Sequence, residues 1–163
     1  MIVVSNTSPL INLATVGQLE LLEPLYGKVI IPQAVYDEIV IEGRGQPGAQ
    51  DVDQLAWIEV EEVGNQLMVM ALEADLDRGE AEAIALVLEL KADLLLIDEH
   101  KGRVAAARLG LKPVGLLGIL VSAKHQGLMT AVKPVMDDLM TKAGFWISSD
   151  LYDHICQVVG ERS

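Results

Sequence analysis

Residues 93–98 read Asp93-Leu94-Leu95-Leu96-Ile97-Asp98, four apolar side chains in a row between two carboxylates. A short apolar run without interruption is typical of a strand that is buried on both faces of a parallel sheet. Ile2-Val3-Val4 and Lys28-Val29-Ile30-Ile31 are similar runs, and each leads through a short connection into a helical pattern. This alternation predicts a three-layer α/β/α sandwich around a central, mainly parallel sheet.

The remaining segments supply the helices and edge strands of such a fold. Residues 57–63 alternate apolar and acidic side chains, which predicts an edge strand with one wet face, and another short strand is expected around Val114. Ser8 is expected to cap the first helix, with Pro9 at its first position. Further helices are predicted over residues 18–26, 33–41, 65–74, 79–90, 100–109, 117–126, 131–142 and 149–159.

The length of 163 residues and a hydrophobic content of 51% fit one domain spanning residues 1–163, with the C-terminal helices of about 117–159 packed on it. A glycine- and proline-rich break at residues 43–48 predicts a mobile surface loop that can act as a lid, and this loop is expected to extend over residues 42–53. Phe145 and Trp146 are expected to complete the core.

Composition excludes several classes of protein. Aromatic residues make up only 4% of the chain, which argues against an RNA binder built on base stacking. The single cysteine, Cys156, cannot form a disulfide framework, and no apolar run approaches the roughly 20 residues that cross a bilayer. No glycine-rich phosphate motif is present. We therefore expect a reduced, cytoplasmic protein with no membrane segment and no nucleotide cofactor.

The net charge of −12 argues against an anionic partner, yet the charge is unevenly distributed. Residues 1–90 hold 16 acidic and 3 basic side chains, whereas residues 91–163 hold 8 acidic and 9 basic ones. Four basic residues follow the pair Asp98 and Glu99 closely, and they are Lys101, Arg103, Arg108 and Lys112. They form either a solvated helix face or a rim that attracts phosphate groups beside an acidic site.

Four side chains are candidates for that acidic site. Asn6 and Asp98 each follow a predicted buried strand, and ligands of parallel sheets collect beyond the carboxyl ends of strands. Glu38 lies in the helix after the second strand. On the helix of residues 79–90, the 100° periodicity directs Glu80 toward the apolar face and Glu82 toward solvent.

Carboxylates gathered without cysteine or suitably spaced histidine are oxygen ligands for a hard cation, Mg²⁺ or Mn²⁺, rather than for zinc. His100, His125 and His154 match no zinc spacing and are expected at the surface or in helix caps. A divalent cation held by carboxylates can orient a water molecule and neutralise phosphate oxygens. The pattern therefore indicates phosphodiester hydrolysis.

Five short motifs follow one another along nearly the whole chain, and they are residues 2–11 (IVVSNTSPLI), 29–38 (VIIPQAVYDE), 79–84 (GEAEAI), 94–99 (LLLIDE) and 115–120 (GLLGIL). In their order and spacing, these motifs resemble the PIN-domain family, in particular its prokaryotic subgroup of unknown function that is associated with toxin–antitoxin modules.

The resemblance implies a ribonuclease that depends on Mg²⁺ or Mn²⁺ and has Glu38, Glu80 and Asp98 as catalytic metal ligands. It implies Asn6 as a further metal ligand, although most PIN domains have an aspartate there. Because an amide carries no negative charge, metal affinity should fall and activity can be lost. Ser8 and Glu99 would support the ligands, and Lys101 and Arg103 would contact substrate.

The resemblance also implies a homodimer and a small DNA-binding antitoxin as partners, with RNA as the substrate. The resemblance leaves two functions open. The protein is either a toxin-like metal-dependent endoribonuclease or an inactive PIN-like module that binds RNA or a partner, and Asn6 argues for the second. A third possibility is a receiver-type signalling domain. Such a domain needs an acidic pair after the first strand, where this chain has Asn6.

Overall fold

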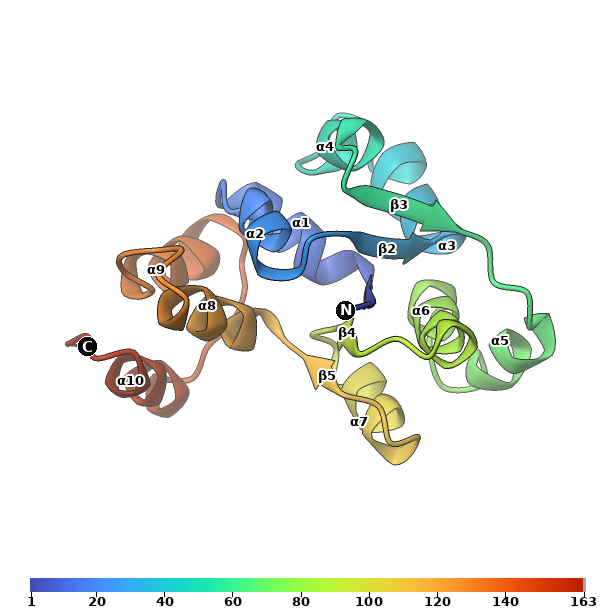
Figure 1. The fold of residues 1–163 in the computed structure, drawn as a ribbon. Coiled ribbons are helices and arrows are strands. Elements are labelled where there is room, and N and C mark those ends of the chain that lie inside the picture. The colour runs from blue at the N-terminus through green and yellow to red at the C-terminus, as the bar shows by residue number, and fades with distance from the viewer. Residues whose placement is uncertain (163) are drawn as a thin grey trace.

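A single five-stranded sheet organises the molecule, of which the computed structural model describes residues 1–162. The strands are β1 (Val3–Ser5), β2 (Val29–Pro32), β3 (Ile58–Glu61), β4 (Leu94–Leu96) and β5 (Pro113–Val114). They are all parallel and lie in the order β3-β2-β1-β4-β5 (Figure 1). From β1 the chain adds β2 and β3 on one side and then β4 and β5 on the other, so the strand order reverses between β1 and β4. Ligands of open α/β sheets bind beyond the strand ends at such a reversal.

Helices cover both faces of the sheet, which confirms the predicted three-layer α/β/α class (Figure 1). Two segments depart from α-helical geometry, the 3-10 turn η1 (Leu19–Leu21) and the π-helical turn η2 (Asp37–Glu42). The helices are α1 (Thr7–Thr15), α2 (Leu22–Tyr26), α3 (Gln33–Tyr36), α4 (Ala49–Gln54), α5 (Gln66–Leu72), α6 (Arg78–Leu90), α7 (His100–Arg108), α8 (Leu116–His125), α9 (Lys133–Lys142) and α10 (Ser149–Val158).

The two-residue repeat of the strands divides the core into two clusters. Val3 and Leu96 pack with apolar residues of α1, α2 and the C-terminal helices α8, α9 and α10. Val4 and Leu95 face the opposite way and pack with α5, α6 and α7. Because successive strand residues point to opposite faces, runs that are apolar throughout serve both clusters, as the sequence predicts.

The prediction for Glu82 is wrong. Glu82 is only 4% exposed. One of its carboxylate oxygens accepts a 3.0 Å hydrogen bond from the Ala34 N–H at the start of α3, and the other forms a 3.1 Å ion pair with the Arg78 guanidinium. The helical projection assumes that one face of the helix meets the core. Every residue of α6 from Gly79 to Val87 is buried, since α3 and α5 as well as the sheet pack on this helix.

The predicted cap of the first helix is also wrong. Helix α1 starts at Thr7, with Asn6 in the capping position and without a hydrogen bond from the Asn6 side chain to the helix. The Ser8 hydroxyl lies inside the first turn and donates instead to Glu99. The start of α1 therefore directs three polar side chains, Asn6, Thr7 and Ser8, away from their own helix.

Two further expectations need correction. Residues 42–53 do not form one loop, because Ala49 and Val52 of α4 are buried and hold that helix against the core. Phe145 packs against the core as expected, but Trp146 is 81% exposed. Within residues 1–162, no helix combines the length and the apolar character that a bilayer span requires.

Candidate metal centre

Asn6 lies immediately after the central strand β1. Its peptide N–H donates a 2.9 Å hydrogen bond to the Leu96 carbonyl, so the ladder between β1 and β4 continues one residue past β1. The residue is 3% exposed, and its side-chain oxygen Oδ1 is buried and accepts no hydrogen bond from the residues that the structure describes. A buried oxygen without a donor is costly and indicates a ligand for a cation or a water molecule.

Asp98 lies beyond the end of the neighbouring strand β4. One oxygen, Oδ1, accepts a 3.0 Å hydrogen bond from the Leu116 N–H at the start of α8, and the other, Oδ2, is buried and has no hydrogen-bond partner among the described residues. Burial raises the pKa of Asp98, although the Leu116 N–H and the Arg103 guanidinium oppose this effect. A second unpartnered oxygen thus lies at the same edge of the sheet as Asn6.

Glu80 enters this edge from the first turn of α6. The N–H of Glu80 donates to the Asp77 side chain at 2.8 Å, and Glu80 Oε1 accepts from the Asp77 N–H at 3.1 Å, which completes a capping box. Burial is the largest cause of the raised pKa of Glu80, and the negative charges of Asp77 and Glu99 add to it. The cap uses Oε1 and leaves Oε2, which lies near Gly102 of α7.

Glu38 reaches the edge from the π-helical turn η2. Its Oε2 accepts a 2.6 Å hydrogen bond from the Thr7 hydroxyl, and its Oε1 lies against Gly79 at the start of α6. The pKa of Glu38 lies above its ordinary value: burial is the largest cause and raises it, the Thr7 hydroxyl and the Gly79 N–H lower it, and the charges of Asp77 and Glu42 raise it. Glu38 therefore ties the start of α1 to the start of α6.

Each of the three carboxylates lies against a glycine at the start of a helix. A Cβ on Gly79 would collide with the carboxylate of Glu38, and one on Gly115 would lie 2.8 Å from Asp98 Oδ1. A Cβ on Gly102 would collide with the Ile97 side chain and lie 3.2 Å from Glu80 Oε2. These glycines leave the space that the carboxylates occupy, at the N-terminal ends of α6, α7 and α8, where helix dipoles favour negative charge.

Glu99 and Ser8 lie beside this group. The Ser8 hydroxyl donates a 2.7 Å hydrogen bond to Glu99 Oε1, and the Glu99 charge contributes to the raised pKa values of both Glu80 and Asp98. The structure thus brings both predicted supporting residues to the edge that carries the predicted ligands.

The available oxygens suit a hard cation. Within residues 1–162, no three acidic, histidine or cysteine side chains converge as a ready ligand cluster. Mg²⁺ nevertheless binds through one or two carboxylates and retains several waters, so a closed cage is not required. Asn6 Oδ1 and Asp98 Oδ2 accept no hydrogen bond from the described residues, and Glu80 Oε2 lies outside the capping box, so these amide and carboxylate oxygens are candidates to bind such an ion.

The two residues predicted to contact substrate, Lys101 and Arg103, lie in different places relative to Asp98. Arg103 lies close enough to Asp98 to oppose the rise in its pKa, and together they line two cavities. Lys101 lies on another side of α7, where it lines a cavity of about 420 Å³ with His100 and Arg108. Only Arg103 of this pair is therefore positioned to contact a ligand at Asp98.

The sequence does not predict the roles of several residues at this site. The spacing of Asp77 and Glu80 is a capping-box pattern that could have shown that Glu80 has a structural role as well. Thr7 offers only a hydroxyl in a polar run, and its bond to Glu38 depends on a contact over 31 positions in the sequence. The close approach of Gly79 to Glu38 has no local signal, because it is a contact between helices.

The chain matches a known protein family over nearly its whole length. A family model described as PIN domain matches residues 2–161. A search of curated proteins finds no match. The matched range includes all five strands, all ten helices of the described residues and every residue of the candidate metal centre. The chain therefore belongs to the PIN-domain family.

Proposed function

We propose that this protein is a divalent-metal-dependent ribonuclease that hydrolyses RNA phosphodiester bonds with Mg²⁺ or Mn²⁺. The observation that carries the proposal is the pair of buried, unpartnered oxygens, Asn6 Oδ1 and Asp98 Oδ2, at the reversal point of the sheet. Carboxylates buried without compensation are destabilising, and a cation at this edge would offset the repulsion that the Glu99 charge exerts on Glu80 and on Asp98.

The residues of the candidate metal centre would have different roles in this reaction. Asp98, Asn6 and Glu80 would hold the cation, and Glu38 would complete the acidic set while it fixes the start of α6. When bound, such an ion supplies an oriented water molecule and charge neutralisation for the phosphate. Arg103, which takes part in none of the ion pairs among residues 1–162, would contact the phosphate of the substrate. Its positive charge offsets repulsion between RNA and the acidic edge.

Matched variants at the two ends of β4 test this proposal. Asp98 follows the carboxyl end of the strand, whereas Asp93 precedes its other end and accepts a 2.7 Å hydrogen bond from the Ile2 N–H. Purified wild type, Asp98→Asn and Asp93→Asn are incubated with structured and single-stranded RNAs and Mn²⁺, with and without a chelator. The proposal requires chelator-sensitive cleavage by wild type and Asp93→Asn only. Equal cleavage by Asp98→Asn would contradict it.

A second function has one specific observation in its favour. Asn6 supplies an oxygen without charge at the innermost position of the site, so the chain can be an inactive member that retains RNA or partner binding. Asn6→Asp separates the two functions. If cleavage with Mn²⁺ occurs in Asn6→Asp and not in the wild type, the binding-module function is correct.

The expected partners remain part of the proposal. A second copy of the chain and a small DNA-binding antitoxin are implied by the family resemblance. Light scattering of the purified protein and copurification of a second chain expressed from a neighbouring gene would test each of them. A monomer at all concentrations would argue against the homodimer.

A further inference from the structure

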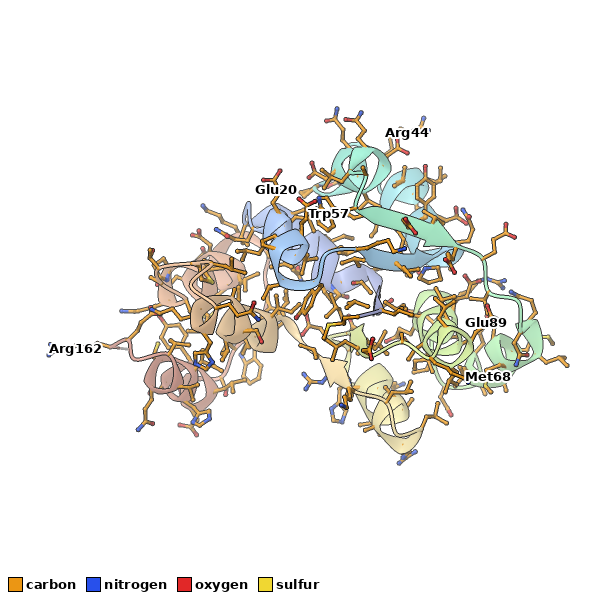
Figure 2. All side chains as sticks on the ribbon, in the orientation of Figure 1. Glu20, Arg44, Trp57, Met68, Glu89 and Arg162 are labelled. Atoms are coloured by element: carbon orange, nitrogen blue, oxygen red, sulfur yellow. The ribbon has the colours of Figure 1, made fainter. Side chains whose placement is uncertain are left out.

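Trp146 is an exposed aromatic side chain without an evident structural role. It follows Phe145 in the segment that joins α9 to α10, and it is 81% exposed, whereas Phe145 packs against the core. The other tryptophan, Trp57, is partly buried against the core at the start of β3 (Figure 2). Because β3 and β5 are opposite edges of the sheet, Trp57 lies far from the cavity described next.

A cavity of about 600 Å³ connects Trp146 to the candidate metal centre. Its volume lies in the range of roughly 300–1,000 Å³ that small-ligand sites occupy. Its lining includes Asp98, whose Oδ2 is buried and accepts no hydrogen bond from the described residues. Arg103, Phe145 and Trp146 also line this cavity.

We propose that this cavity is a nucleobase subsite, in which one unpaired base of single-stranded RNA stacks on Trp146 while the adjoining phosphate contacts Arg103. This inference rests on the proposed ribonuclease function and assigns the substrate class of the same site: an unpaired segment rather than a duplex. In a duplex the bases are stacked on one another and cannot lie on a protein side chain.

The mixed lining of the cavity, with charged as well as aromatic side chains, supports a nucleotide over a purely apolar occupant. An indole offers a flat face on which any base can stack, and Arg103 is an exposed cation that takes part in none of the ion pairs of the described chain. A peptide with apolar side chains would leave the Arg103 guanidinium without an ion pair and Asp98 Oδ2 without a hydrogen-bond partner. The low aromatic content excludes an array of stacking residues, but one subsite needs only one.

Because the chain has only two tryptophans, a single substitution allows the fluorescence of the other one to be measured alone. Trp57→Phe leaves Trp146 as the only indole, and Trp146→Phe leaves Trp57. Each variant is titrated with a single-stranded RNA of about eight nucleotides and with a duplex of the same sequence, with Ca²⁺ in place of Mn²⁺ to slow cleavage. The single strand should quench the indole fluorescence of Trp57→Phe and leave that of Trp146→Phe unchanged. The duplex should quench neither.

Steady-state cleavage with Mn²⁺ gives a second readout. Trp146→Leu should raise KM for single-stranded RNA about 10-fold, since stacking on the indole is lost, and Trp146→Phe should fall between Leu and wild type. The kcat should change less than about twofold, because the indole does not touch the reacting atoms. Abasic residues are then placed at each position of the RNA in turn. At one position the abasic residue should raise KM for the wild type and leave KM for Trp146→Leu unchanged.

The outcomes separate this inference from the function on which it rests. Metal-dependent cleavage with the same KM in wild type and Trp146→Leu, together with no quenching of Trp146, would overturn the subsite and leave the ribonuclease intact. Quenching by duplex as strong as by single strand would overturn it as well. Absence of cleavage by the wild type with every RNA would instead refute the ribonuclease, and quenching would still show whether RNA occupies the cavity.

Discussion

The N–H of Asn6 donates a 2.9 Å hydrogen bond to the carbonyl of Leu96 and so joins the ends of β1 and β4 at the point where the strand order reverses. This bond fixes the backbone on either side of the candidate metal centre. Asn6 lies one residue after β1 and Asp98 two residues after β4, so both unpartnered oxygens are held at one edge by the sheet itself. A site built on the sheet needs little rearrangement to receive an ion.

The bond from Thr7 to Glu38 should matter for metal binding. Thr7→Val keeps the shape of the side chain and removes the hydroxyl that donates to Glu38 at 2.6 Å, whereas Thr7→Ser keeps the donor. Loss of a hydrogen bond that holds a residue beside the metal ligands lowers metal affinity roughly 10-fold or more. We expect the Mn²⁺ concentration for half-maximal cleavage to rise by that factor in Thr7→Val and to stay near the wild-type value in Thr7→Ser. Equal values for the two variants would contradict the role of this bond.

Gly79 should not accept a methyl group. Gly79→Ala places a Cβ against the Glu38 carboxylate, which can make room only by leaving its 2.6 Å hydrogen bond with the Thr7 hydroxyl, so we expect a loss of roughly 1–3 kcal/mol of stability. Gly118→Ala is the matched control, since its Cβ on α8 meets only Val114 Cγ1 at 3.2 Å and alanine is the better helix former. Urea unfolding should show a loss of stability for Gly79→Ala only. A loss of the same size in Gly118→Ala would mean that the fold resists any added methyl group.

Glu80 and Glu82 should behave differently although they lie two residues apart on one helix. Glu82→Ala leaves the Ala34 N–H without its acceptor, which costs about 1–3 kcal/mol of stability, while the Mn²⁺ affinity of the folded protein should not change. Glu80→Gln retains an oxygen for the Asp77 N–H, so its stability should stay close to wild type, but Mn²⁺ binding should weaken.

Urea unfolding and Mn²⁺ titration of both variants check this contrast. Weaker Mn²⁺ binding in Glu82→Ala, or a stability loss without a binding defect in Glu80→Gln, would contradict the assignment of the two carboxylates.

The C-terminal helices should depend on the charge of Glu161. Its carboxylate accepts hydrogen bonds from the Val132 and Lys133 N–H groups at 2.7 and 3.0 Å and pairs with Lys124 at 3.0 Å. Burial opposes ionisation, but these donors outweigh it and lower the pKa of Glu161 below its ordinary value. A depressed pKa in the folded state stabilises the protein above the ordinary pKa, and the stabilisation is lost as the pH falls through the lowered value.

Glu161→Gln should therefore lower stability at neutral pH by about 1–3 kcal/mol, and the difference from wild type should shrink on acidification. Urea unfolding at a series of pH values measures this difference. Glu62→Gln, which changes an exposed carboxylate, is the control and should follow wild type throughout. A difference between Glu161→Gln and wild type that persists unchanged at acidic pH would show that the charge of Glu161 is unimportant.

The sheet and the strand ends were accessible to sequence reasoning because each signal is local. The run from Leu94 to Ile97 is apolar on both faces, and Asn6 and Asp98 are polar residues directly beyond such runs. Glu82 could not be assigned in this way, since its burial depends on α3 and α5 packing on sides of α6 that a helical projection leaves to solvent. The exposure of Trp146 likewise depends on where its connecting segment lies relative to β5 and α8.

Direct measurement of Mn²⁺ binding tests the central claim that the edge of β1 and β4 holds a divalent cation. Electron paramagnetic resonance of free Mn²⁺ counts bound ions without any assumption about the substrate. We predict that wild type and Asp93→Asn remove Mn²⁺ from solution with equal affinity and that Asp98→Asn binds it at least about 10-fold more weakly. Equal binding by all three proteins, or no binding by wild type, would contradict the account.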